Sequence, residues 1–406
     1  MQQPPPLPGT PARARVAVID VIRGLALCGL PLIHALEFGF SEVPLSVPDE
    51  LSPGDQFFWY VVAIFAVGKF ISLFGLLFGA GIVLATRRAD DLGQPVAARF
   101  SRRFGVLFLI GLMHAYLIWY GDILVPYALI GFLVFWGRRW SIRWLCSFGV
   151  VLLAVFPLTS LLLGLLAIGF EVDLSGMTED DAETEKFDEW WKQSFEGGWL
   201  EQMPARALAA FVIQLVGIPL YLVWFSGGLM FLGMAGARTG YLLGEKSVGL
   251  YRKLALICVP AGLLLGVIGK IIAKSQMDRP ELLMTFLFVG YGAILVTACG
   301  YLNLLLWWSK RSPGGAVWNS LADVGQMALS NYLLQSILFG LIFHGHGLGL
   351  SDELPYGVVL LVCPILWLIG ISVSRWWLDR YRFGPVEWLW RRLTYLRPVP
   401  NRRVRE

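Results

Sequence analysis

Apolar runs long enough to cross a membrane recur along the whole 406-residue chain. A helix needs about 20 consecutive apolar residues to span the hydrocarbon core of a bilayer, and several runs are longer than that. Hydrophobic residues make up 56% of the chain and charged residues only 15%, whereas a soluble domain carries roughly a quarter charged residues. The sequence therefore predicts an all-α, polytopic integral membrane protein.

Hydropathy predicts about ten transmembrane helices. We place them at residues 16–37, 57–85, 104–120, 122–137, 144–170, 207–236, 250–272, 282–308, 326–343 and 356–378. The first run carries charge inside it and lacks a small-residue cleavage pattern, so it does not read as a removable signal peptide. The expected organisation is a disordered Pro-rich leader at 1–12, a single transmembrane domain at 13–378 and a basic cytoplasmic tail at 379–406.

The basic residues predict the orientation of these helices, because short cytoplasmic loops collect lysine and arginine. With the N-terminus in the cytoplasm, 25 of the 33 basic residues fall on the cytoplasmic side, five on the opposite side and three within spans. Both termini are therefore expected in the cytoplasm. The net charge of +4 follows from this sidedness, and no nucleic-acid partner is indicated.

One long loop, residues 171–206, is acidic and is expected outside the cytoplasm. Its aromatic residues fall at helical spacing, which predicts a short helix lying along the membrane interface; they are Phe187, Trp190, Trp191, Phe195 and Trp199. Two interpretations stay open. The helix is either an anchor without chemistry or a lid over an outward-facing pocket.

The first predicted helix carries ionisable side chains at membrane depth, where each costs a few kcal/mol. Arg23 and His34 are eleven residues apart, which places them on one stripe, about 16 Å apart along the axis. Asp20 and Glu37 extend the stripe at spacings that permit pairing. Pro31 is expected to kink the helix just before the histidine. The alternative is a buried Asp20–Arg23 ion pair with a structural histidine.

A second polar group comprises His114 and Asp122, on either side of a tight turn between two predicted helices. Their spacing predicts an acid–base pair around an outward pocket. Lys69 lies well inside another span, where it could neutralise a phosphate or carboxylate or extend toward the interface. The same span contains Gly75 and Gly79, a small-xxx-small pair that predicts close helix packing.

Asn331 and Gln335 share one face of the ninth predicted helix. They could hydrogen-bond a substrate or join helices together, which is the commoner use of such residues. His344 and His346 follow in an outer loop, but two histidines without a third ligand do not define a metal site. The five cysteines show no CxxC spacing, so neither a disulfide framework nor structural zinc is predicted.

Five blocks of the chain resemble, in order, the bacterial YeiB-like family, also called domain of unknown function 418. These blocks are "IDVIRGLALCGLPLIH", "GKFISLFGLLFGAG", "RRFGVLFLIGLMHAYLIWYGDILVPYALIG", "GQMALSNYLLQSILF" and "RFGPVEWLWRRL". That family is grouped with transmembrane acyltransferases, which include the acyltransferase-3 proteins and the lysosomal heparan glucosaminide N-acetyltransferase. In the acyltransferase-3 branch, an arginine followed after ten residues by a catalytic histidine marks the first helix, and Arg23 and His34 match that spacing.

The resemblance implies a membrane-bound acyltransferase of the bacterial cytoplasmic (inner) membrane. It would move an acyl group from cytoplasmic acyl-CoA, such as acetyl-CoA, to a hydroxyl or amine of an extracytoplasmic glycan or small molecule, without a metal. The residues expected to carry catalysis are His34, His114 and Asp122. Those expected to hold the donor are Arg23, Lys69 and Asp20, with the basic loop 86–103 near the nucleotide phosphates. Those expected to contact the acceptor are Asn331, Gln335 and Glu37.

An alternative from a different class is a transporter or membrane scaffold, in which the polar stripe forms a substrate or proton path without covalent chemistry. Membrane lipids are partners under either interpretation, and homodimerisation stays open. The two functions differ in one structural respect. An enzyme of this kind requires His34 and His114 to converge on one pocket that is open to both faces of the membrane.

Overall fold

The computed structural model describes residues 12–40, 52–170, 172, 182–276, 279–312 and 314–403. Residues 1–11 of the expected leader therefore lie outside the described residues. The described elements are helical: α1 (Ala12–Gly39), α2 (Pro53–Phe65), α3 (Lys69–Asp91), α4 (Ala97–Leu117), α5 (Leu124–Val134), η1 (Phe135–Arg139), α6 (Ile142–Gly169), α7 (Ala182–Glu196), α8 (Met203–Val212), η3 (Ile213–Leu222), α9 (Val223–Arg238), α10 (Val248–Ser275), α11 (Pro280–Arg311), α12 (Ala316–Gln326), α13 (Ala328–Phe343), α14 (Tyr356–Val359), α15 (Val362–Leu378) and α16 (Pro385–Tyr395).

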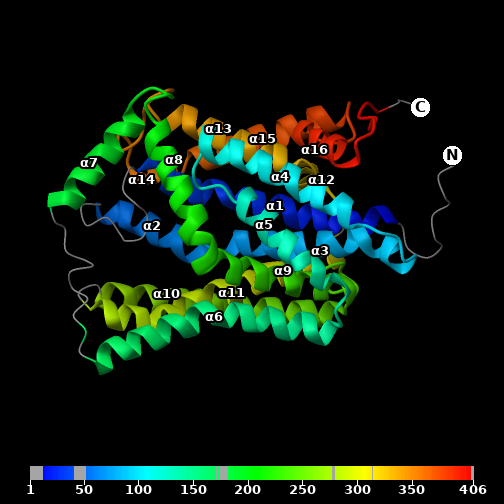
Figure 1. Ribbon diagram of the computed structural model, residues 1–406, viewed down its shortest axis with the longest axis horizontal. Helices are drawn as coiled ribbons and strands as arrows, with labels where there is room; N and C mark the ends of the chain where they lie inside the picture. The colour runs from blue at the N-terminus through cyan, green and yellow to red at the C-terminus, as the bar shows by residue number, and fades with distance from the viewer. Residues whose placement is uncertain are drawn as a thin grey trace.

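The long helices run along a common direction in two groups (Figure 1). Helices α6, α10 and α11 pack together along one edge, and α3 and α9 join them to the rest. Helix α1 packs against α3, α12 and α13. The start of α1 and the end of α16 lie at one end of the bundle, whereas α7 and α14 lie at the opposite end (Figure 1).

Within the described residues, seven helical segments are long and apolar enough to cross a membrane, or eight if one bent pair counts as a span. That pair is α12 and α13, which meet at 85°. The chain is therefore polytopic. The ten predicted spans include these eight and two more, the helices α4 and α5. Helix α5 has 11 residues and is only about 16 Å long. The turn joining α4 to α5 is buried at Trp119 and Asp122, which are 1% and 5% exposed.

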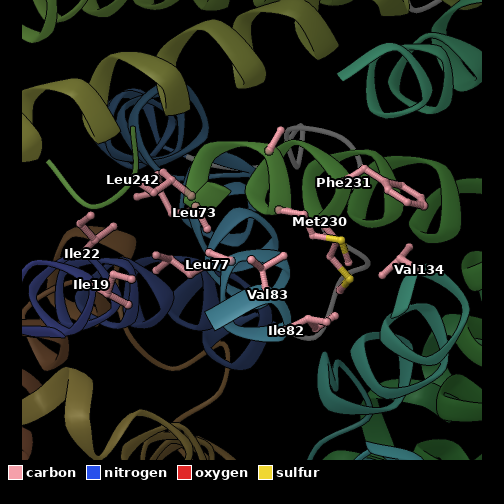
Figure 2. Packing of buried hydrophobic residues seen from close by; sticks show 14 of the residues in the cluster. Ile19, Ile22, Leu73, Leu77, Ile82, Val83, Val134, Met230, Phe231 and Leu242 are labelled. Carbon is pink, nitrogen blue, oxygen red and sulfur yellow. The ribbon is translucent and has the colours of Figure 1, made fainter. Parts of the chain in front are cut away.

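A buried apolar cluster joins α1, α3, α5 and α9 (Figure 2). Because lipid tails are as apolar as leucine, such helices associate through close packing more than through the hydrophobic effect. Gly79 shows how close the packing is, since a Cβ there would lie 1.9 Å from the Met230 carbonyl oxygen. Gly75 likewise faces Leu229 on the same neighbouring helix. The packing role predicted for these two glycines is confirmed.

The end of the chain is more than a basic tail. Helix α16, within the segment 379–406, packs against α4 and α13. The helix predicted in the loop 171–206 is present as α7, which contacts α8. Trp191 of α7 is 9% exposed and contacts the Tyr120 ring, whereas Trp190 is 39% exposed. One side of α7 thus rests on the bundle beside the α4–α5 turn.

Candidate functional site

A cavity of about 260 Å³ lies between α1, α3, α4, α5, α13 and α16. Its walls are mainly leucine and phenylalanine side chains, with charged groups at one end and Tyr332 among its lining residues. At the charged end, the Arg23 side chain is 31% exposed. A cavity of this size exceeds roughly 150 Å³, the volume of an engineered cavity that binds benzene.

Three arginines line the charged end: Arg23 of α1, Arg103 of α4 and Arg391 of α16. Arg23 donates to the Asp20 carboxylate at 2.8 Å and to the Gly325 carbonyl at 3.3 Å. Arg103 lies 3.9 Å from the centre of the Trp390 ring. A guanidinium is a planar, permanently charged fork that suits phosphate or carboxylate, so this end of the cavity favours an anion.

Glu387 explains how α16 is held at the cavity. Its carboxylate accepts hydrogen bonds from the backbone N–H groups of Leu329 and Ser330 and from the Ser330 hydroxyl. It therefore caps the N-terminus of α13, where negative charge is favourable. Burial nevertheless raises the pKa of the Glu387 carboxyl above its usual value. The Trp390 indole adds a second connection by donating to the Arg103 carbonyl at 2.8 Å.

His114 and Asp122 form a buried pair beyond the opposite end of the cavity. The His114 Nδ1 atom lies 2.8 Å from Asp122 Oδ1, and the two side chains are 0% and 2% exposed. The other carboxylate oxygen accepts from the Val125 backbone N–H at 2.6 Å. Because an ionised carboxylate can only accept, the proton of a neutral His114 resides on Nδ1. Its Nε2 atom is then a free base, and it is buried without a partner in the described part of the chain.

Tyr332 connects this pair to the cavity. Its hydroxyl accepts from the Ile123 backbone N–H at 3.3 Å and lies 3.5 Å from His114 Nδ1. The two rings are 4.8 Å apart, centre to centre. Tyr332 also lines the cavity, so a ligand at this end would touch the residue that contacts the histidine.

His34 reaches the same place from the other side. It is 5% exposed and is surrounded by four aromatic rings, those of Phe38, Trp119, Tyr332 and Phe339. Its Nδ1 atom has no partner among the residues described. His34 does not itself line the cavity. The two histidines predicted from the sequence thus both contact the Tyr332 ring, but neither of them lines the cavity itself.

The two histidines and two of the arginines share one spacing. His34 follows Arg23 by eleven residues on α1, and His114 follows Arg103 by eleven residues on α4. Each interval corresponds to about 16 Å along a helix. Two helices therefore present an arginine at the charged end and a histidine near the inner end. The spacing of Arg103 and His114 could therefore have been recognised in the sequence in the same way as that of Arg23 and His34.

The remaining predicted site residues lie elsewhere. The Lys69 ammonium donates to the Ala63 carbonyl at 2.9 Å, and Asn331 donates to the Ser374 hydroxyl at 2.8 Å. Neither of them lines the cavity, and Gln335 and Glu37 do not line it either. Lys69 thus joins α3 to the end of α2, and Asn331 joins α13 to α15. The sequence reasoning missed Tyr332, Glu387 and Arg391.

His344 lies beneath α7. Its ring stacks on Phe38 at 5.0 Å and contacts Phe195 of α7 at 4.8 Å. The backbone N–H of Gly345 donates to the Phe195 carbonyl at 2.9 Å. Helix α7 therefore covers the aromatic side chains that enclose His34. This position is compatible with both interpretations of the loop, the anchor and the lid.

Comparison with known proteins places the chain among bacterial relatives. A family model described as "Protein of unknown function (DUF418)" matches residues 236–397, a segment that includes Tyr332, Glu387 and Arg391. The chain is 32% identical over 390 residues to "Uncharacterized protein YeiB" of Escherichia coli (strain K12), covering 94% of this chain and 96% of that protein. It is 30% identical over 404 residues to "Uncharacterized protein YxaH" of Bacillus subtilis (strain 168), covering 94% of each.

Proposed function

We propose that this chain, which belongs to the DUF418 family together with YeiB and YxaH, is a membrane-bound acyltransferase. It takes an acyl group from acyl-CoA and transfers it to a hydroxyl or amine of a glycan or small molecule on the other side of the membrane. One observation carries the proposal. A single cavity has three arginines at one end, and its Tyr332 contacts the His114–Asp122 pair.

The arrangement fits an extended thioester donor. The phosphates of CoA would bind Arg23, Arg103 and Arg391, and the pantetheine arm would lie along the apolar walls. The arm must then cover about 16 Å, the length of eleven helical residues, before the thioester reaches Tyr332. In this proposal Arg103 and Arg391 replace Lys69 as donor-binding residues, because Lys69 is outside the cavity.

His114 is the group best placed to act as a base. As the acceptor attacks the thioester carbonyl, its proton passes to His114 Nε2, while Asp122 holds the ring and stabilises the imidazolium that forms. The C–S bond then breaks, and the departing thiolate takes that proton. The products are the acylated acceptor and free CoA. His34 packs against the Tyr332 ring and in this proposal holds that ring in position.

We also propose ten spans with both termini in the cytoplasm. This topology puts the three arginines on the side of cytoplasmic acyl-CoA and α7 on the acceptor side. A reporter fused after Gly197 is expected to be active outside the cytoplasm, and one fused after Arg403 inside it, because basic residues are retained in the cytoplasm. Cytoplasmic activity of the Gly197 fusion would contradict the topology.

Binding of acetyl-CoA to the purified full-length protein tests the function directly. We expect titration calorimetry in detergent to give a saturable signal that weakens with added salt, because phosphate–arginine attraction is screened. Adenosine 3′,5′-bisphosphate, which carries phosphates without the arm, should bind more weakly. Absence of acetyl-CoA binding, or binding without any thioester cleavage or transfer, would favour the transporter or scaffold alternative.

A further inference from the structure

We infer that the inner end of the cavity is a subsite for a short acyl group, in which the Tyr332 hydroxyl donates a hydrogen bond to the acyl carbonyl oxygen. This inference rests on the proposed function, because it names the substrate class and the group that contacts the reacting carbonyl. It depends on where the Tyr332 proton can go.

A tyrosine hydroxyl has one proton to donate and can accept hydrogen bonds as well. In the described structure the Tyr332 oxygen lies within hydrogen-bond distance of two groups, the Ile123 backbone N–H and His114 Nδ1. The first is a donor. The second carries a proton as well, because it donates to Asp122. The Tyr332 proton therefore has no protein acceptor in this arrangement, and a ligand in the cavity can supply one.

A buried hydroxyl with an unused proton is costly when no acceptor is present, and Tyr332 is 3% exposed. A thioester carbonyl gains negative charge on its oxygen during attack. A fixed donor aimed at that oxygen stabilises the transition state more than the ground state. The Ile123 N–H strengthens this donor, because a hydroxyl that accepts one hydrogen bond becomes a better donor in another.

The surroundings of Tyr332 limit the length of the acyl group. Beyond it lies His34, whose ring is 6.4 Å away, with Phe38 and Phe339 packed against that histidine. None of these three residues lines the cavity. An acyl carbonyl at Tyr332 therefore leaves room for only a short chain, whereas the apolar walls nearer the arginines are occupied by the pantetheine arm.

Tyr251 provides a matched comparison outside the cavity. It is buried and does not line the cavity. Like Tyr332, its hydroxyl accepts from a backbone N–H, that of Lys246 at 3.0 Å, but it also donates to the Tyr241 carbonyl at 2.9 Å. Its proton is thus already used, and removing this hydroxyl should leave the reacting carbonyl unaffected.

The first test measures acetyl-CoA cleavage by the purified full-length protein, with water as the acceptor. Tyr332→Phe is expected to lower kcat about 100-fold, the effect of removing one oxyanion donor, with KM changed less than about threefold. Tyr251→Phe should keep kcat within about threefold of wild type. A Tyr332→Phe variant with wild-type kcat, or one altered only in KM, would overturn the inference.

The second test uses binding alone, so that it does not depend on turnover. Acetonyl-CoA carries a ketone where S-isobutyl-CoA carries a methyl branch of similar size. Wild type should prefer the ketone about tenfold, the usual value of a hydrogen bond to an uncharged group, and Tyr332→Phe should bind both equally. Equal binding by wild type would overturn the inference even if acetyl-CoA is cleaved.

Chain length provides the third test. Cleavage of acetyl-CoA or propionyl-CoA is expected to exceed cleavage of octanoyl-CoA at least tenfold in kcat/KM. Faster cleavage of octanoyl-CoA would show that the inner end is not a short-acyl subsite, while leaving the proposed acyltransferase function in place. If no acyl-CoA binds to wild type, the proposed function and this inference fail together.

Discussion

Replacing His114 with glutamine is expected to reduce acyl transfer about 100- to 10,000-fold, the range that a positioned general base contributes. Glutamine keeps an N–H group that can donate to the buried Asp122, so the carboxylate is not left unpaired, but it offers no basic nitrogen. Initial rates with saturating acetyl-CoA measure the loss. Donor binding should change less than about threefold, because His114 does not line the cavity.

His346→Gln serves as the control for this variant. His346 lies near the bundle end under α7, where its Nδ1 is 3.2 Å from Gln202 Oε1. It is not among the hydrogen-bond partners of His114 or Asp122 in the described residues. Its replacement should leave the rate unchanged. A His114→Gln protein that folds, binds acetyl-CoA and still transfers at the wild-type rate would contradict the assignment of the base.

Asp122 offers an independent check on the same chemistry. In Asp122→Asn the amide could donate to His114 Nδ1, which would move the ring proton to Nε2 and remove the free base. The rate should then fall as in His114→Gln. His34→Gln distinguishes the roles of the two histidines. His34 contacts the Tyr332 ring but is not the base in this proposal, so its replacement should lower the rate less than His114→Gln does.

The sequence predicted the apolar helices and the polar stripe of α1 because both depend on local periodicity. An arginine and a histidine eleven residues later must lie on one face of any straight helix. The same reasoning identified His114 with Asp122, which are joined by a short turn. Each of these features is set within one helix or one hairpin, so the sequence contains enough information to place it.

The residues that the sequence did not reveal depend on contacts between distant segments. Tyr332 lies in an apolar helix and resembles an ordinary packing residue in the sequence. The chain bends by 85° between α12 and α13, and α13 places the Tyr332 hydroxyl beside the α4–α5 turn. Arg391 lay in what reads as a cytoplasmic tail, where the positive-inside rule explains any arginine. Its place at the cavity follows from the Glu387 cap on α13. Glu387 accepts there from the backbone of Leu329 and Ser330, which precede it in the sequence by 58 and 57 residues.

Lys69 was predicted to bind the donor, but its ammonium group bonds to the backbone instead. A lysine within a span suggests a ligand site, but the break between α2 and α3 leaves carbonyl groups without helical partners. Its ammonium satisfies one of them, the Ala63 carbonyl. The charge of a residue at membrane depth therefore did not by itself distinguish a ligand-binding role from a structural one. The backbone geometry around it was needed.

Replacing Arg391 with glutamine is expected to weaken acetyl-CoA binding about 10- to 100-fold, because a hydrogen bond to a charged group contributes about 1.5–3 kcal/mol. Arg103→Gln should act in the same direction, and titration calorimetry measures both. The rate at saturating donor should stay within about threefold of wild type, since these arginines are expected to bind the phosphates equally in the ground and transition states.

Arg392→Gln is the matched control for Arg391→Gln. It removes the same charge from the next position of α16, but Arg392 is exposed, stacks on Trp388 at 5.4 Å and does not line the cavity. If both variants weaken binding equally, the effect comes from the overall positive charge of this surface and the arginine subsite is wrong. If only Arg391→Gln weakens binding, the guanidinium in the cavity is the group that holds the donor.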